Sequence, residues 1–297
     1  MRTPLSMLTL AALAALTACS AKDAGNTDST KVAQTGAPAG TATSRGAFDP
    51  ATHVATVYAK DFVFEAPDSI SAGLTTFHLV NEGPALHHVQ LARLDSGKTV
   101  ADFEAAMKNP GPPPAWLVFV GGPNAPEPGG TFDAMVDLKE GSYVLVCLVD
   151  IPDHTPHVMK GMLRPMKVTA ASGAPATAPN ADVTLTLADY NFLIDGALTA
   201  GKHTIKIENK GPQAHEIEII RLAPGKTAKD FGAWVQTMQG PPPANAIGGI
   251  SATIPGTTSY INVDLTPGNY ALVCFVPDVK DGKAHIEHGM IKEVTIK

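Results

Sequence analysis

Alternating hydrophobic and polar positions dominate the chain from about residue 48 onward. Short runs of β-branched and aromatic residues recur between turn residues at intervals of roughly eight to twelve positions. In the C-terminal half this pattern predicts strands at 183–188, 203–208, 216–222, 257–265, 270–276 and 291–296. Many short strands at this spacing are typical of an all-β sandwich or barrel.

Two segments break the β pattern. Thr99 and Asp102 have the spacing of a capping box, and apolar residues then recur at helical spacing until Pro110. The segment from Thr227 to Met238 has the same features. We therefore expect one short helix inserted in each half of the chain.

The two halves are copies of one another, offset by about 128 positions. Asn81–Pro84 matches Asn209–Pro212, and the proline triplet at 112–114 matches the one at 241–243. The repeat predicts two tandem domains, a first copy at 48–170 and a second copy at 182–297. A short linker rich in alanine and proline, 171–181, joins them.

An apolar run at residues 5–15 precedes both copies and is too short to span a bilayer, so residues 1–19 are expected to be an export signal. It ends in Leu16-Thr17-Ala18-Cys19, which resembles a bacterial lipobox. The resemblance implies a lipid on Cys19, and residues 20–47 would form a flexible tether. The protein would then be anchored at the cell envelope, on a periplasmic or extracellular face, and at the outer membrane if the organism has one. The alternative is an ordinary secreted protein cleaved near Ala18.

Charge and composition narrow the range of partners. The formal net charge is −6 and no basic cluster occurs, so we expect no nucleic-acid partner. No other apolar run of the sequence suggests a membrane span, which leaves the lipid as the expected membrane anchor.

Each copy contains a single cysteine. The chain has three cysteines, and with Cys19 assigned to lipidation only Cys147 and Cys274 remain, one per copy. A disulfide within a copy is therefore excluded, and each thiol needs another role.

Strand parity selects one histidine in each copy. In the second copy His215 shares the apolar face of its strand with Ile217 and Ile219. In the first copy His87 aligns with His215 and has the same parity, whereas His88 falls on the polar side. We therefore prefer His87 as the inward residue.

One loop in each copy holds three further candidate ligands. Cys147 is followed by His157 after nine residues (148–156) and by Met162 after four more, and the second copy repeats this order with a loop of ten residues (275–284). Two imidazoles, a thiolate and a weak thioether suit copper. The candidate set is His87, Cys147, His157 and Met162 in the first copy, and His215, Cys274, His285 and Met290 in the second.

This arrangement resembles the cupredoxin, or blue-copper, family. The resemblance is carried by the Asn81 to His87 spacing with Gly83-Pro84 between, and by Tyr143 four positions before Cys147. It implies two Greek-key β-sandwiches, one type 1-like copper ion per domain, and the eight residues above as ligands. It also implies electron transfer at the envelope with a redox or copper-donor protein as partner.

Other functions remain open at this stage. The loops between cysteine and histidine are longer than in familiar cupredoxins, and His288 is an additional candidate ligand, which favours copper storage, sensing or delivery without electron transfer. A metal-free structural module on the same scaffold is a further alternative. We expect no enzyme, because apolar residues rather than histidines flank both cysteines and no His-x-His pair occurs.

Overall fold

The computed structural model describes residues 45–95, 97–108, 113–172 and 176–297. In the first copy the elements are β1 (Phe48–Asp49), β2 (Val54–Lys60), β3 (Val63–Glu65), β4 (Ser69–Ser71), β5 (Gly73–Asn81), β6 (Gln90–Leu94), α1 (Val100–Met107), β7 (Leu117–Gly121), β8 (Thr131–Leu138), β9 (Gly141–Val146), the 3-10 helix η1 (His157–Lys160) and β10 (Leu163–Thr169). The predicted lipidated Cys19, the signal 1–19 and most of the tether 20–47 lie outside the described residues.

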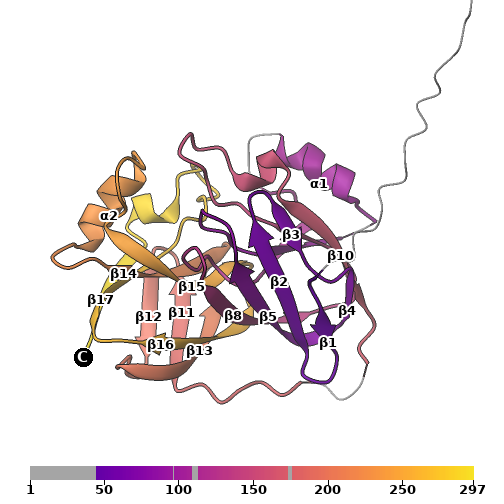
Figure 1. The fold of residues 1–297 in the computed structure, drawn as a ribbon, viewed down its shortest axis with the longest axis horizontal. Helices are drawn as coiled ribbons and strands as arrows, with labels where there is room; N and C mark the ends of the chain where they lie inside the picture. Colours follow the sequence, from indigo (N-terminus) through magenta and orange to yellow (C-terminus); the bar gives the residue numbers. More distant parts are fainter. Residues whose placement is uncertain (1–44, 96, 109–112, 173–175) are drawn as a thin grey trace, which may run out of the picture. The chain divides into compact units, whose positions relative to one another are not determined.

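The second copy has nearly the same order of elements. These are β11 (Val183–Ala188), β12 (Asn191–Asp195), β13 (Gly201–Asn209), β14 (His215–Leu222), α2 (Ala228–Val235), β15 (Ala244–Thr253), β16 (Thr258–Leu265), β17 (Gly268–Val273), η2 (His285–His288) and β18 (Ile291–Ile296). The prediction of all-β sandwiches with one short helix inserted in each copy is confirmed (Figure 1).

Both helices begin as the sequence predicts. The Thr99 hydroxyl accepts a hydrogen bond from the amide of Asp102, and the Asp102 carboxylate accepts one from the Thr99 amide at 2.9 Å. Thr227 and Asp230 form the same capping box at the start of α2. These bonds satisfy amide groups that the first helical turn leaves without partners.

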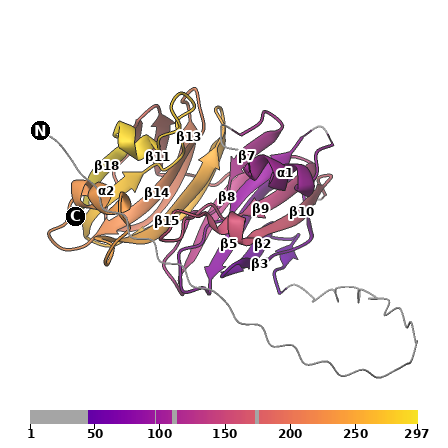
Figure 2. The ribbon, with the colours of Figure 1, turned by 90° about the horizontal axis from the view of Figure 1, so that it is seen from above.

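The strands of the two copies form continuous sheets. Among the described residues, one nine-stranded sheet has the order β1-β2-β5-β8-β16-β13-β11-β12, with β3 beside β2, and the other the order β18-β17-β14-β15-β7-β6-β9-β10-β4. The copies join where β8 pairs with β16 (Val136 with Ser259) and where β7 pairs with β15 (Val120 with Thr253). Figure 2 shows the two copies side by side. Both copies lie in one compact unit.

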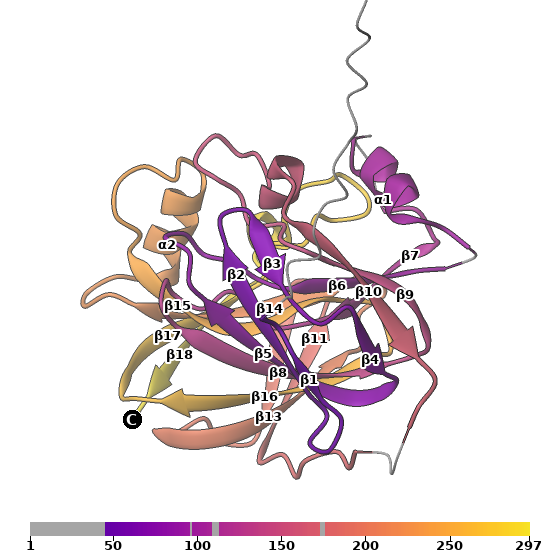
Figure 3. The same cartoon turned by 45° about the vertical axis from the view of Figure 1, so that its right-hand side comes forward.

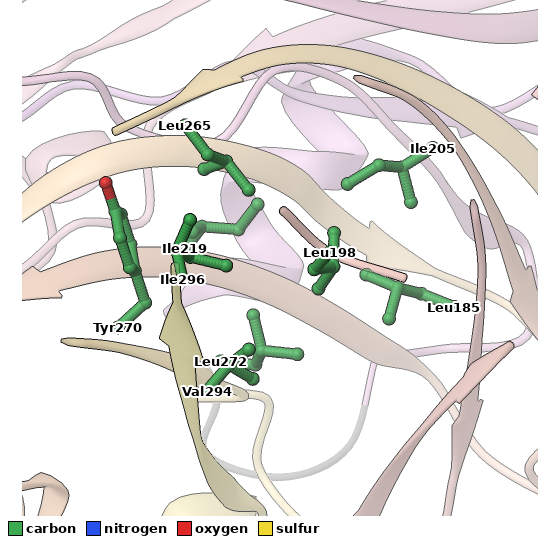
Figure 4. A pocket seen from close by; sticks show the side chains of 9 residues that line it. All are labelled: Leu185, Leu198, Ile205, Ile219, Leu265, Tyr270, Leu272, Val294 and Ile296. Carbon is green, nitrogen blue, oxygen red and sulfur yellow. The ribbon is translucent and has the colours of Figure 1, made fainter. Parts of the chain in front are cut away.

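Apolar side chains from the two sheets meet between them. In the second copy, Leu185, Ile205 and Leu265 come from one sheet, and Ile219 and Leu272 from the other (Figure 4). This hydrophobic interior provides a rigid support for the loops at the ends of the strands.

Helices α1 and α2 lie at the same end of the structure (Figures 1 and 3). Phe103 of α1 packs in one apolar cluster with Val158 of η1, and Phe231 of α2 does so with Ile286 of η2. Each inserted helix therefore helps to fix the 3-10 helix that follows the long loop. No helix in the described part of the chain has the length and apolar character needed to cross a membrane.

Candidate metal centre

Two histidines and one cysteine of the first copy meet in a buried group, which we call the first cluster. His87 lies just before β6, Cys147 directly follows β9, and His157 begins η1. The Sγ atom of Cys147 is 3.4 Å from Nδ1 of His157 and 4.0 Å from Nδ1 of His87, and the two Nδ1 atoms are 3.1 Å apart. None of the three residues is more than 1% exposed.

The second cluster has the same construction. His215 is the first residue of β14, Cys274 follows β17, and His285 begins η2. The corresponding separations are 3.3, 4.0 and 3.1 Å, and all three residues are fully buried. Two sets of side chains, brought together by different stretches of sequence, thus converge on one geometry.

The three donor atoms of each cluster fit a single small metal ion. Nitrogen and sulfur ligands about 2.0–2.3 Å from one ion, in a trigonal or tetrahedral arrangement, would lie about 3.3–3.8 Å from one another. The observed separations of 3.1 to 4.0 Å bracket that range. A donor set of two imidazoles and a thiolate is suited to copper.

Met162 and Met290 are joined to their clusters through the backbone. The Met162 amide donates to the carbonyl of His157 at 3.2 Å, and the Met162 carbonyl accepts from the amide of Cys147 at 3.3 Å. Met290 makes the same two bonds in the second copy, at 2.9 and 3.2 Å, and both methionines are fully buried. Each thioether would be the fourth, weaker ligand of an ion held by its cluster. Metal binding by the four residues of each copy stays a prediction.

The long loops return the second histidine to the cluster by forming a small hairpin. The amide of His157 donates to the carbonyl of Val149 at 2.9 Å, and the amide of Val158 donates to the carbonyl of Cys147 at 2.8 Å. His285 and Ile286 make the matching bonds in the second copy. The additional residues therefore extend the loop outward without displacing the histidine.

Two aspartates that the sequence argument did not select lie behind the clusters. Oδ1 of Asp61 is 2.7 Å from Nε2 of His87, and Oδ1 of Asp189 is 2.9 Å from Nε2 of His215. A carboxylate on Nε2 places the proton there, so that Nδ1 presents its lone pair to the cluster. The two aspartates align in the repeat, which is the signal that could have identified them.

Burial controls the protonation of both clusters. It raises the pKa of the Cys147 thiol to about 12 and also raises that of Cys274. It lowers the pKa values of His157 and His285 to about 4, with a further contribution from the neighbouring histidine. At neutral pH the imidazoles are therefore neutral and ready to bind a metal, whereas each thiol must release a proton on binding.

His88 is buried but is not part of the first cluster. Its Nε2 accepts a hydrogen bond from the amide of Leu148, the residue after the cluster cysteine, at 2.8 Å. In the second copy the carboxylate of Glu216 accepts from the amide of Phe275 at 2.9 Å. The residue after each inward histidine thus holds the backbone that follows each cysteine.

His288 lies outside the second cluster. Its Nε2 is 3.2 Å from Oδ1 of Asp281, and with Asp278 these residues form a separate group whose candidate ligand atoms lie within 4.8 Å of one another. Both carboxylates already accept hydrogen bonds, from the Lys280 amide and the Gln213 side chain for Asp278 and from the Lys283 amide for Asp281. The structure therefore does not bring His288 to the donor atoms of the second cluster.

Several solved structures that this chain resembles are cupredoxin-fold copper proteins. Auracyanin from the photosynthetic bacterium Roseiflexus castenholzii is 19% identical, covering 40% of this chain and 97% of its own, with a TM-score of 0.28. The blue copper oxidase from Nitrosomonas europaea is 15% identical over 81% of this chain and 85% of its own, with a TM-score of 0.25. The copper nitrite reductase from the same organism is 14% identical over 82% and 93%, with a TM-score of 0.24.

Comparison by sequence adds nothing to these similarities. No protein-family model matches the chain, and no curated protein matches it. At identities of 14–19%, similarity to these solved structures bears on the fold alone.

The sequence led us to expect that the chain is not an enzyme, and the comparison with solved structures contradicts this expectation. Multicopper oxidases and copper nitrite reductases, which are enzymes, are among the solved structures that it resembles.

Proposed function

We propose that this chain is a copper protein that carries electrons, with one type 1-like copper ion in each copy. The observation that supports this most directly is that the two clusters have the same geometry. The largest difference between corresponding donor-atom distances is in the distance from the cysteine Sγ to Nδ1 of the second histidine, which is 3.4 Å in the first cluster and 3.3 Å in the second. Copper held by two imidazoles, a thiolate and a weak thioether supplies one-electron redox chemistry.

The surrounding residues suit this role. Full burial of the cluster cysteines excludes water, and the carboxylates of Asp61 and Asp189 hold one imidazole of each cluster in a fixed orientation. Backbone hydrogen bonds connect each methionine to the cysteine and histidine beside it. A rigid donor set of this kind keeps the ligands in place when the charge of the ion changes.

Titration of the metal-free protein with Cu(II) tests the proposal. We expect two equivalents to bind with an intense visible thiolate-to-copper band and a narrow copper hyperfine splitting in the EPR spectrum. Cys147→Ser and Cys274→Ser should each remove one equivalent and about half of the band, because each removes the thiolate of one cluster. His288→Ala is the matched control and should retain both. A band that survives loss of both cysteines, or no band at all, would refute the proposal.

Copper storage, sensing or delivery is the second candidate function, and the long loop in each copy favours it. These loops extend beyond the hairpin bonds that return His157 and His285, so a partner could reach them. The two functions differ in redox behaviour. Bound Cu(I) that neither air nor a soluble one-electron oxidant converts to Cu(II) would favour storage over electron transfer.

We further propose that a lipid on Cys19 anchors the protein at the cell envelope, where a redox or copper-donor protein would be its partner. The lipobox-like sequence supports the anchor. Cys19→Ala should move the protein from the membrane fraction to the soluble fraction, and mass spectrometry of the mature N-terminus should lose the acyl chains. An unchanged membrane association would refute the anchor.

A further inference from the structure

The two clusters match in spacing but differ in the side chains beside them. The aromatic ring against the second histidine is Phe62 in the first copy and Tyr190 in the second, with ring centroids 5.0 and 5.5 Å from His157 and His285. The residue after the Gly-Pro pair that both copies share differs, and so does the residue after the β-bridge at the base of each long loop. The first copy has Phe62, Ala85 and Ile151 where the second has Tyr190, Gln213 and Asp278.

The three polar residues of the second copy form one network. The Tyr190 hydroxyl donates to Oδ2 of Asp278 at 2.6 Å, and Nε2 of Gln213 donates to the same oxygen at 2.9 Å. Nε2 of Gln213 also lies 3.3 Å from Oδ1 of Asp189, the carboxylate behind His215. One amide thus connects the carboxylates that stand behind both histidines of the second cluster.

Asp278 places a buried negative charge next to that cluster. Its side chain is 1% exposed, and its Oδ2 lies 3.8 Å from Nε2 of His285. That nitrogen is buried and has no hydrogen-bond partner among the described residues, so its N–H group faces the carboxylate as the nearest acceptor given by the structure. In the first copy the corresponding position is the apolar Ile151, whereas the carboxylate behind His215 does have a counterpart, Asp61 behind His87.

We propose that Asp278, held by Tyr190 and Gln213, makes the second site favour Cu(II) over Cu(I) more strongly than the first site does. The inference rests on the proposed copper function. A carboxylate one imidazole ring away from the ion stabilises the higher charge, and burial leaves that interaction poorly screened. Consider the protein with both copper ions bound and only one of them reduced. If the reduced ion is in the second site, its electron passes to the first site, so that the second site becomes Cu(II) and the first becomes Cu(I). No proton or additional reactant takes part.

The consequence is a fixed order of filling. The first electron from a soluble one-electron reductant enters the first site, and the second site is reduced afterwards. Asp278 acts here as a positioning residue, because it lies beside a ligand histidine rather than among the donor atoms.

Spectroelectrochemical titration of the copper-loaded full chain tests the inference. Cys274→Ser reports the first site alone and Cys147→Ser reports the second, and we expect their Cu(II)/Cu(I) ratios at one potential to differ at least tenfold, which is about 59 mV for a one-electron couple. Asp278→Asn, made in the Cys147→Ser background, should remove most of that difference. Asn retains an oxygen for the bonds from Tyr190 and Gln213. Asp281→Asn, which neutralises a more exposed acid of the same loop, is the matched control and should change the ratio less.

The reciprocal variant adds the charge to the first copy. Ile151→Asp should shift the first site toward Cu(II), and urea unfolding of each metal-free variant establishes that it is folded. Equal midpoints for the two sites, or an Asp278→Asn midpoint equal to that of the unaltered second site, would overturn this inference while leaving the proposed function intact. Failure of the unaltered protein to form a thiolate-to-copper band would overturn the proposed function and this inference with it.

Discussion

Gly83 is the position at which one added carbon should disable the first cluster. A Cβ atom there would lie 2.4 Å from Nε2 and 2.8 Å from Cδ2 of His87, and 3.2 Å from Oδ1 of Asp61. Non-bonded carbon and nitrogen atoms pack at about 3.5–4.0 Å, so in Gly83→Ala the imidazole must move by roughly 1 Å. Such a movement changes the position of the ring relative to its carboxylate partner at Nε2 and to the donor atoms that surround Nδ1.

The cost has two parts. Overpacking a close-packed interior by one methyl group costs roughly 1–3 kcal/mol of unfolding free energy. A displacement of Nδ1 by roughly 1 Å also moves one donor atom out of ligand distance, since metal sites tolerate about 0.2 Å. Gly211→Ala should act in the same way on the second cluster, because its Cβ would lie 2.5 Å from Nε2 of His215.

The assay combines urea unfolding of the metal-free protein with copper titration. We expect each variant to lose about 1–3 kcal/mol of stability and to bind one copper ion tightly in place of two. Gly232→Ala in α2 is the control: nothing lies within 4 Å of its added carbon, and the change should stabilise the helix by about 0.5–1 kcal/mol. If Gly83→Ala matched the control in stability and bound two ions with equal affinity, the steric reasoning would be refuted.

Three further predictions follow from other contacts. Asp61→Asn and Asp189→Asn should each weaken copper binding about 10- to 100-fold at their own site, measured by competition with a chelator, and an unchanged affinity would exclude an orienting role. Burial raises the pKa of Glu218 above its unfolded value, so the unfolded chain binds fewer protons above pH 4.5 or so and stability falls as the pH rises. Glu218→Gln should flatten that fall between pH 5 and pH 8 in urea unfolding, whereas an identical slope would contradict the assignment. Thr99→Ala and Thr227→Ala should each cost about 1 kcal/mol through loss of the N-cap, which thermal unfolding can detect, and no change in melting temperature would show that the cap contributes nothing.

The fold was predictable wherever one face of a strand is polar. The six strands expected in the second copy are present, and β11 and β18 have the expected ends. Two strands were not anticipated. β12 is short and pairs only at the edge of its sheet, and β15 contains Gly248 and Gly249 and is buried along most of its length, so it lacks the alternation that reveals a strand.

The cluster was predictable in part. Parity and the internal repeat selected His87 over His88, and the structure brings His87 together with Cys147 and His157. His87 itself lies in the irregular segment before β6 rather than within the strand. Asp61 lies far from the candidate ligands in sequence, and only the closed sandwich brings it to His87. Such a contact depends on tertiary packing, which the local periodicity of a sequence does not reveal.

Joined sheets have a consequence for how the two copies could be separated. Hydrogen bonds cross between the copies at several points, including Ser251 Oγ to the carbonyl of Val89 at 3.0 Å and Gln90 Nε2 to the carbonyl of Ala252 at 3.0 Å. Cleavage of the linker 171–181 would therefore leave the halves associated. A single copy expressed alone would expose the edges of β7 and β8, or of β15 and β16, which invite pairing with another chain. Because the copies are alike, the nearest substitute partner is a second molecule of the same half, and a half-length protein should be isolated as a dimer or an aggregate.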